Sequence, residues 1–224
     1  MVMSTGSRKS EDFRSSRRKV KSLERLKIPI DAGSAILGKR GVGKSELTKF
    51  LARELPYNLG VLDVVGNLSD LKKLGKPMFG FEARIGLGGG YRLVDYRLID
   101  PQDEDAISNA VNAWMEKGHV LALFDEADRY SYFAASKTPL SHFINLARNY
   151  GCGYIATARR TANISPDFLA NATYLFVFRH IHPRDLQVLG EWLEIDIEVI
   201  RHLDDHEFIV FKDGEPLFKA KLDL

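Results

Sequence analysis

The chain has 224 residues, of which 45% are hydrophobic; this is enough for one α/β domain with a substantial core and too few for two. It contains no apolar stretch near the roughly 20 residues of a membrane-spanning helix, and its basic N-terminal region lacks the apolar segment of a secretory signal. A single cysteine, Cys152, excludes an internal disulfide, and the six histidines show no metal-ligand spacing. We therefore expect a protein of the reducing cytoplasm without a transmembrane segment.

Charge is distributed unevenly along the chain, although the formal net charge is only +2. Residues 1–27 carry nine basic and three acidic side chains with almost no aromatic ones, so this segment cannot bury a core. We expect a basic, flexible N-terminal arm at residues 1–27 and a single domain at residues 28–224. Such an arm contacts nucleic acid or an acidic partner, or it is a solvated tail without a partner.

The first motif of the domain is a phosphate-binding loop. Residues 34–37 form an apolar strand candidate, residues 46–55 have apolar side chains at helical spacing, and the segment between them matches the pattern G-x-x-x-x-G-K-[ST]. Backbone N–H groups would surround a nucleotide phosphate, Lys44 would reach the β- and γ-oxygens, and the Ser45 hydroxyl would bind Mg²⁺. The alternative is a glycine turn without a nucleotide. The predicted ATP-binding residues are Gly38, Lys39, Arg40, Gly41, Val42, Gly43, Lys44, Ser45 and Glu46.

The next part of the chain continues the alternation of strands and helices. We expect a strand at residues 59–65, a short helix at 68–76, a glycine-rich stretch at 86–90, a strand at 91–99 and a helix at 103–117. The glycine-rich stretch lies between Arg84 and Arg92, which suits a loop that contacts passing DNA phosphates. The alternative is a flexible connection between two sheet elements.

The second motif is the apolar strand at residues 120–124, followed by Asp125 and Glu126. Such a strand delivers Asp125 to the carboxyl edge of the sheet, where it would share Mg²⁺ with Ser45. Glu126 would then lie near the γ-phosphate and act as the general base that polarises the attacking water. The alternative is that the two acids only cap the next helix, but the complete phosphate loop earlier in the chain favours catalysis.

The remaining pattern completes the fold class. It predicts a helix at residues 140–150, a strand at 154–157, a short helix at 166–170, a strand at 173–179, a helix at 183–193 and a hairpin at 207–222 that turns at Asp213-Gly214. This alternation implies an α/β fold with a mainly parallel sheet, helices on both faces and a C-terminal β-hairpin.

One further segment resembles a known family. Residues 147–160 read A-R-N-Y-G-C-G-Y-I-A-T-A-R-R, which resembles the FtsK/HerA family of DNA-pumping ATPases, whose members have a helix ending in Ala-Arg, a glycine turn and a strand running into Thr-Gln-Arg-Pro. The chain is most similar to the small genome-packaging ATPases of tailless viruses with an internal membrane, and somewhat similar to the zonula-occludens-toxin group of filamentous phages. The resemblance implies a P-loop NTPase fold of the RecA-like (ASCE) type that uses ATP and Mg²⁺.

The resemblance also implies catalytic roles for two arginines. Arg148 matches the family's arginine finger, which one subunit supplies to the γ-phosphate of its neighbour. The alternative is a helix C-terminal arginine that interacts with the helix dipole. Counted without gaps, Arg159 falls on the family's sensor glutamine, and an arginine there would sense phosphate charge directly. With a one-residue gap, Ala158 takes that place instead; either way this chain lacks the glutamine. The residues that compete with Arg148 for the finger role are Arg129, Arg179 and Arg184.

Two functions remain as alternatives. The first is a ring-forming ATPase, hexameric or pentameric, that translocates double-stranded DNA without reading its sequence and packages a viral genome into a capsid. Its partners would be DNA, copies of itself and capsid, portal or membrane proteins, in the host cytoplasm or associated with the virion. The second is a nucleotide-switched assembly or secretion factor of the zonula-occludens-toxin type that pumps no DNA. Glu126 favours turnover, because a pure binding module needs no water activator.

Overall fold

The computed structural model describes residues 26–78, 92–130 and 139–223. The predicted N-terminal arm up to residue 25, the glycine-rich stretch and Arg84 lie outside the described residues. The strands are β1 (Gly33–Leu37), β2 (Asn58–Asp63), β3 (Lys76–Pro77), β4 (Leu93–Leu98), β5 (Val120–Phe124), β6 (Gly153–Ala158), β7 (Ala172–Phe178), β8 (Glu207–Lys212) and β9 (Glu215–Lys221). The α-helices are α1 (Lys44–Glu54), α2 (Glu104–Lys117), α3 (Pro139–Leu146), α4 (Pro166–Ala170), α5 (Pro183–Trp192) and α6 (Ile197–Arg201).

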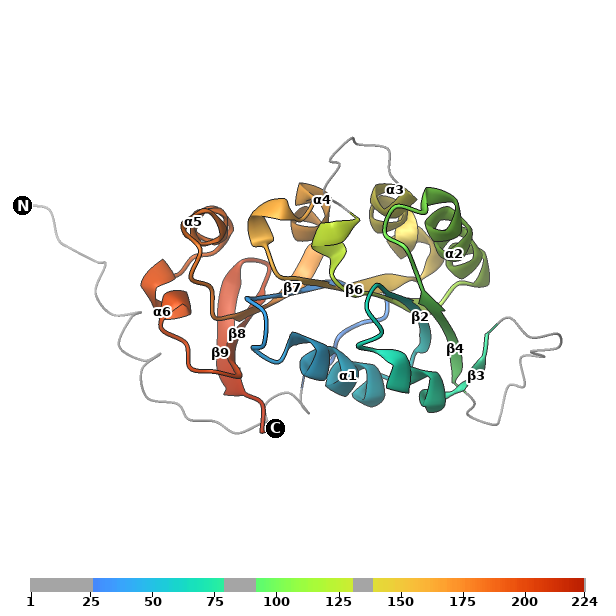
Figure 1. The fold of residues 1–224 in the computed structure, drawn as a ribbon, viewed down its shortest axis with the longest axis horizontal. Helices are drawn as coiled ribbons and strands as arrows, with labels where there is room; N and C mark the ends of the chain where they lie inside the picture. The colour runs from blue at the N-terminus through green and yellow to red at the C-terminus, as the bar shows by residue number, and fades with distance from the viewer. Residues whose placement is uncertain (1–25, 79–91, 131–138, 224) are drawn as a thin grey trace, which may run out of the picture.

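The described strands form a single sheet with the order β3-β4-β2-β5-β6-β1-β7-β8-β9 (Figure 1). Neighbouring strands from β3 to β7 in this order are parallel, whereas β8 and β9 are antiparallel and form the expected C-terminal hairpin. The predicted α/β class with a mainly parallel sheet is therefore confirmed. Because β5, β6 and β1 are parallel neighbours, their carboxyl ends meet at one edge of the sheet.

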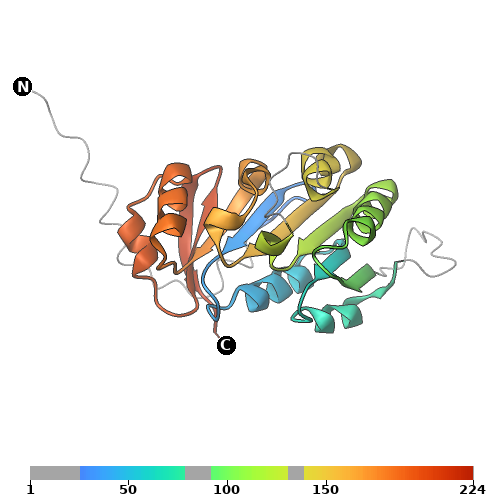
Figure 2. The same cartoon turned by 45° about the horizontal axis from the view of Figure 1, so that its top comes forward.

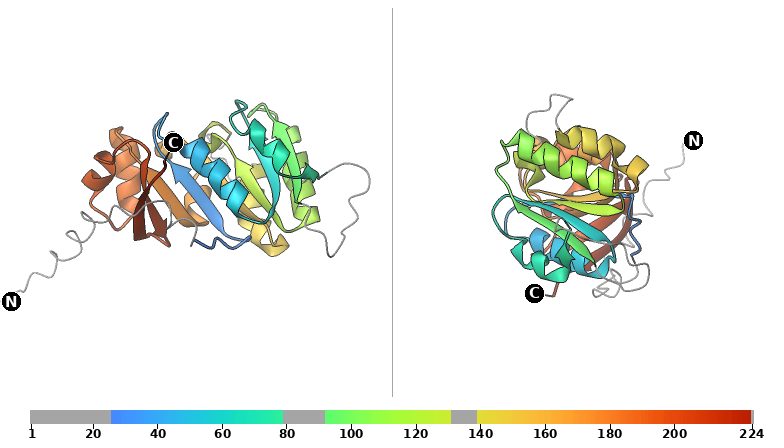
Figure 3. Two further views of the ribbon diagram at one scale, coloured as in Figure 1. Left: turned by 90° about the horizontal axis from the view of Figure 1, so that it is seen from below. Right: turned by 90° about the vertical axis from the view of Figure 1, so that its right-hand side faces the viewer.

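Helices cover both faces of the sheet, as the views in Figures 2 and 3 show. Helices α2, α3, α4 and α5 pack on one face, and α1 packs on the other beside a 3₁₀ helix, Ser69–Leu74 (Figure 1). An aromatic cluster fills the first layer: Phe124 on β5 meets Phe143 of α3 edge to face, with 5.7 Å between ring centroids, and Trp114 of α2 lies beside both. In the described ranges, no helix combines the length and apolar character needed to cross a membrane.

Several predicted boundaries differ from the observed ones for local reasons. The strand expected to reach Val65 ends at Asp63, because the Asp63 carboxylate accepts N–H bonds from four following residues and turns the chain. The expected helix at 68–76 is the shorter 3₁₀ helix, and the helix expected at 140–150 changes to 3₁₀ geometry after Leu146. Helix α6 was not predicted, and neither was β3, whose two residues are too few to show an alternating pattern.

A substitution at Gly60 of β2 tests how tightly the sheet packs against α2. A Cβ at this position would lie 2.3 Å from Cε2 of Trp114, and that indole is held in place by its N–H bond of 2.8 Å to the Asp95 carboxylate. We expect Gly60→Ala to lower the free energy of unfolding by about 1–3 kcal/mol or more, since overpacking forces side chains to shift. Urea unfolding measures this value.

The matched control is Gly190→Ala in α5, where an added Cβ meets no atom within 4 Å. This change should leave the free energy of unfolding unchanged or raise it slightly, because alanine favours the helix over glycine. Equal unfolding midpoints for the two variants would contradict the packing of Gly60 against Trp114.

Candidate functional site

The loop from Gly38 to Gly43 connects β1 to α1 at the carboxyl edge of the sheet. Gly41 and Gly43 have φ angles of 84° and 99°, which lie in the left-handed region that favours glycine. The Lys44 ammonium group donates hydrogen bonds to the carbonyl oxygens of Gly38 (2.8 Å) and Lys39 (2.9 Å), so the lysine is tied back across the loop. Gly43 at the N-cap of α1 offers the first turn no side-chain acceptor, which leaves N–H groups for an anion.

Lys44 is desolvated in the phosphate loop. Burial lowers the pKa of Lys44 to about 8, although the carboxylates of Asp128 and Asp125 partly oppose this shift. No carboxylate of the described residues lies within ion-pair distance of its Nζ. A bound phosphate would stabilise the charged form of this desolvated amine, as expected for a phosphate-binding lysine.

The acidic pair after β5 is organised by a threonine from the neighbouring strand. Asp125 is only 1% exposed, and burial raises the pKa of its carboxyl group. The Thr157 hydroxyl on β6 donates to Asp125 Oδ1 (2.9 Å) and accepts the backbone N–H of Glu126 (2.9 Å). One hydroxyl thus fixes both acids relative to the phosphate loop.

Glu126 adopts a strained backbone and pairs with two arginines. Its φ of 51° and ψ of 48° are left-handed, which is uncommon for a residue other than glycine and frequent at functional sites. Its carboxylate lies 3.1 Å from Arg129 Nη1 and 3.4 Å from Arg159 Nε. The structure therefore brings the predicted general base, the predicted sensor arginine and one competing arginine into contact.

A second turn at the same edge contributes residues that the sequence did not single out. Asp63 is fully buried at the end of β2 and accepts hydrogen bonds from the Tyr96 hydroxyl and from the backbone of the turn that follows. This turn presents Asn67, whose side-chain amide lies 3.5 Å from Asp125 Oδ2. In the sequence, the one local signal for this turn is an aspartate at the end of a strand, shortly before Gly66-Asn67.

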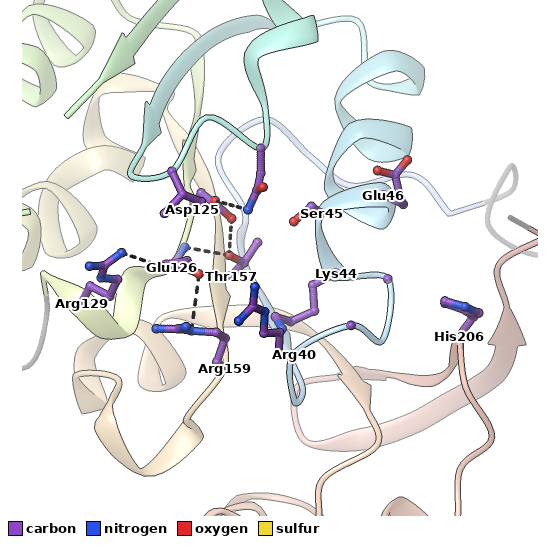
Figure 4. A pocket seen from close by; sticks show the side chains of 14 residues that line it. Arg40, Lys44, Ser45, Glu46, Asp125, Glu126, Arg129, Thr157, Arg159 and His206 are labelled. Carbon is purple, nitrogen blue, oxygen red and sulfur yellow. Dashed lines mark hydrogen bonds and ion pairs between the residues drawn. The ribbon is translucent and has the colours of Figure 1, made fainter. Parts of the chain in front are cut away.

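These elements surround a cavity of about 590 Å³ at the carboxyl edge (Figure 4). The described residues that line it are Arg40, Gly41, Gly43, Lys44, Ser45, Glu46, Val65, Asn67, Asp125, Glu126, Arg129, Thr157, Arg159 and His206. The predicted loop residues Gly38, Lys39 and Val42 do not line the cavity. The carbonyl oxygens of Gly38 and Lys39 instead accept hydrogen bonds from Lys44. Concave shape, cationic side chains and free helix N–H groups fit the polyphosphate of a nucleotide.

The cavity also fits Mg²⁺ bound together with phosphates. Ser45 and Asp125 both line it. The Oδ2 atom of Asp125 makes only a long contact, of 3.5 Å, with the Asn67 side-chain amide. The described residues contain no group of three or more His, Cys, Asp or Glu side chains that would hold a metal alone. Mg²⁺ usually takes one or two protein ligands and completes its shell with phosphate oxygens and water, so Ser45 and Asp125 are the residues that could hold it here.

Two predicted site residues lie outside the cavity. Arg148 follows α3 at the opposite, amino edge of the sheet, where its side chain is 82% exposed and 3.5 Å from Asp31. Arg92 donates hydrogen bonds to the carbonyl oxygens of Ala52 and Tyr57, and burial lowers its pKa to about 10. This placement argues against the predicted DNA contact at Arg92, because its guanidinium caps α1 instead of facing solvent. The competitors Arg179 and Arg184 are not among the cavity-lining residues.

Comparison with protein-family models and with curated protein sequences finds no significant match. Solved structures match the fold. The genome packaging NTPase B204 from Sulfolobus turreted icosahedral virus 2, in complex with ATP-gammaS, has a TM-score of 0.69 at 18% identity over 88% of this chain and 100% of that chain. EssC (ATPases 2 and 3) from Geobacillus thermodenitrificans has a TM-score of 0.54 at 16% identity over 82% of this chain and 38% of that one.

The Type VII secretion ATPase EccC of Thermomonospora curvata is similar to a comparable degree, with a TM-score of 0.55 at 15% identity over 85% of this chain and 24% of that one. The B204 match spans nearly the whole of both chains, whereas the matched region is 38% of the EssC chain and 24% of the EccC chain. The chain therefore has the P-loop NTPase fold of these solved structures.

Proposed function

We propose that this protein hydrolyses ATP and uses the energy to move double-stranded DNA, as a genome-packaging motor would. The single observation that carries the proposal is the contact of Glu126 and Asp125 with Thr157 at the rim of the phosphate loop. This contact places a candidate water activator and a candidate metal ligand in the same cavity as Lys44. Similarity in fold and length to the B204 genome packaging NTPase supports the DNA-moving part of the proposal.

Each role follows from the position of a side chain. Lys44 and the N–H groups at the start of α1 would bind the β- and γ-phosphate oxygens. Glu126 would accept a proton from the water that attacks the γ-phosphorus, while the bond from this phosphorus to the bridging oxygen of the β-phosphate breaks. Arg159 would stabilise charge on the transferred phosphoryl group from within the same chain. Mg²⁺, held by Ser45 and Asp125, would offset negative charge on the phosphates.

We further propose that the protein acts as a homo-oligomeric ring in which Arg148 serves the neighbouring subunit. Its exposed guanidinium lies at the edge opposite the cavity of its own chain, so it can reach a γ-phosphate only across an interface. Hydrolysis would then depend on correct packing of the ring. An assembly or secretion factor without DNA movement is the second candidate, since EssC and the secretion ATPase EccC have a similar fold.

Substitutions at Lys44 and Glu126 should separate nucleotide binding from hydrolysis. Lys44→Ala should weaken ATP binding by more than about tenfold, because it removes the cation from the phosphate loop. Glu126→Gln should bind ATP like the parent but hydrolyse it about 100-fold more slowly, since the amide cannot accept the proton. Glu198→Gln, the same chemical change on the exposed α6, is the control. Calorimetry and phosphate release measure the two steps, and parental turnover in Glu126→Gln would refute the base assignment.

Mixing inactive variants should reveal which arginine acts across an interface. Arg148→Ala mixed with Glu126→Gln should regain part of the ATPase rate, because an intact glutamate and a neighbour's intact arginine can then complete one site. Arg159→Ala mixed with Glu126→Gln should regain none, since both residues belong to one cavity. Full activity of the parent as a dilute monomer would exclude the ring and the trans role of Arg148.

Duplex DNA should stimulate ATP hydrolysis, and its binding should weaken as salt rises, because each phosphate neutralised by the protein releases counter-ions. Arg84→Ala should flatten the slope of log affinity against log salt by about one unit, and deletion of residues 1–25 should flatten it further. Arg201→Ala, which removes an exposed arginine paired with Glu198 on α6, should leave the slope unchanged. An ATPase rate insensitive to DNA would favour the assembly factor.

A further inference from the structure

The cavity extends to both sides of the phosphate loop. Glu126 follows β5, which lies two strands from β1 on one side, whereas His206 precedes β8, which lies two strands from β1 on the other. Both residues line the same cavity. Figure 4 shows the acids on one side of Lys44 and Ser45, with Glu46 and His206 on the other.

The direction of a bound nucleotide follows from this arrangement. Lys44 has to reach the terminal phosphates, and Glu126 has to face the γ-phosphate where water attacks. The rest of the nucleotide must then extend away from Glu126, toward the part of the cavity bounded by Glu46 and His206. His206 lies beyond Lys44 from Glu126, so it would meet a part of the ligand other than the terminal phosphates. The cationic side chains that line the cavity lie on the Lys44 and Glu126 side of His206 in Figure 4: Arg40, Lys44, Arg129 and Arg159.

His206 has features of a ligand-binding residue. Its φ of 65° is left-handed, and its carbonyl oxygen accepts the N–H of Leu222 (3.1 Å), which fixes the backbone in this conformation. The ring is half-buried, and its Nδ1 is buried without a hydrogen-bond partner among the described residues. Of the described residues that line the cavity, His206 is the one with a ring.

We infer that the His206 end of the cavity receives the nucleoside part of the nucleotide, with the imidazole ring packed against the base; this rests on the proposed hydrolysis of ATP at the same site. An imidazole offers a flat π-face for stacking and ring nitrogens for hydrogen bonds to the base or ribose. Such stacking accounts for roughly five- to a hundredfold in affinity when a ring is removed. His206 would therefore make the site select a nucleoside triphosphate over bare polyphosphate.

The test compares two ligands that share phosphates and differ in the nucleoside. Calorimetry with Mg²⁺ measures binding of ATP-γS and of inorganic tripolyphosphate to the full chain, to His206→Asn and to His206→Gly. Asparagine and glycine both tolerate the left-handed backbone, so these changes remove the ring without adding strain. His202→Asn is the matched control, since His202 is exposed at the C-terminal end of α6 and absent from the cavity lining.

Both His206 variants should bind ATP-γS roughly tenfold more weakly and tripolyphosphate as the parent does, whereas His202→Asn should change neither affinity. Retained tripolyphosphate binding also shows that the variants are folded. Parental ATP-γS affinity in the variants, or an equal loss for both ligands, would overturn the inference. A parent chain that binds tripolyphosphate as tightly as ATP-γS would overturn it while leaving the phosphate site intact. A parent that binds neither ligand would refute the proposed function itself.

Discussion

The parallel alignment of β1, β6 and β5 is the constraint on which the site depends. Leu37 pairs with Ala158 and Phe124 pairs with Ala156, so the chain leaves all three strands at the same height on the carboxyl edge. The phosphate loop follows β1 and the acidic pair follows β5, while β6 between them carries Thr157 near its end. One hydroxyl group on β6 therefore bonds to both acids at the end of β5.

Burial sets the charge balance of this edge. It lowers the pKa of Lys44 and raises the pKa of Asp125, so each group loses part of its preference for the charged form. Glu126 instead keeps two arginines within ion-pair distance, on a strained backbone that the Thr157 hydrogen bond supports. The described partners of Lys44 and Asp125 are neutral groups, so a polyphosphate with a divalent cation would add opposite charges beside both, which suits the cavity to such a ligand better than to a neutral one.

The two sheet edges divide the proposed work between subunits. The carboxyl edge holds the cavity with the acids, the phosphate loop and His206, whereas the amino edge carries the exposed Arg148 beside Asp31. The antiparallel hairpin of β8 and β9 extends the sheet beyond β7 and brings His206 to the side of the phosphate loop away from the acids. A nucleotide bound across this edge would thus meet the central strands at its phosphates and the C-terminal hairpin at its nucleoside.

The sequence by itself determined the features that depend on local spacing: the phosphate loop, the acids that end an apolar strand, the α/β alternation and the C-terminal hairpin, because backbone turns and apolar periodicity are properties of short segments. Arg159 was found only through its likeness to a family motif. Thr157, Asn67 and His206 were not predicted, and Arg92 was assigned to DNA although it caps α1. Their partners lie on other strands and helices, and only the order in which the folded chain sets these elements side by side decides which side chains meet.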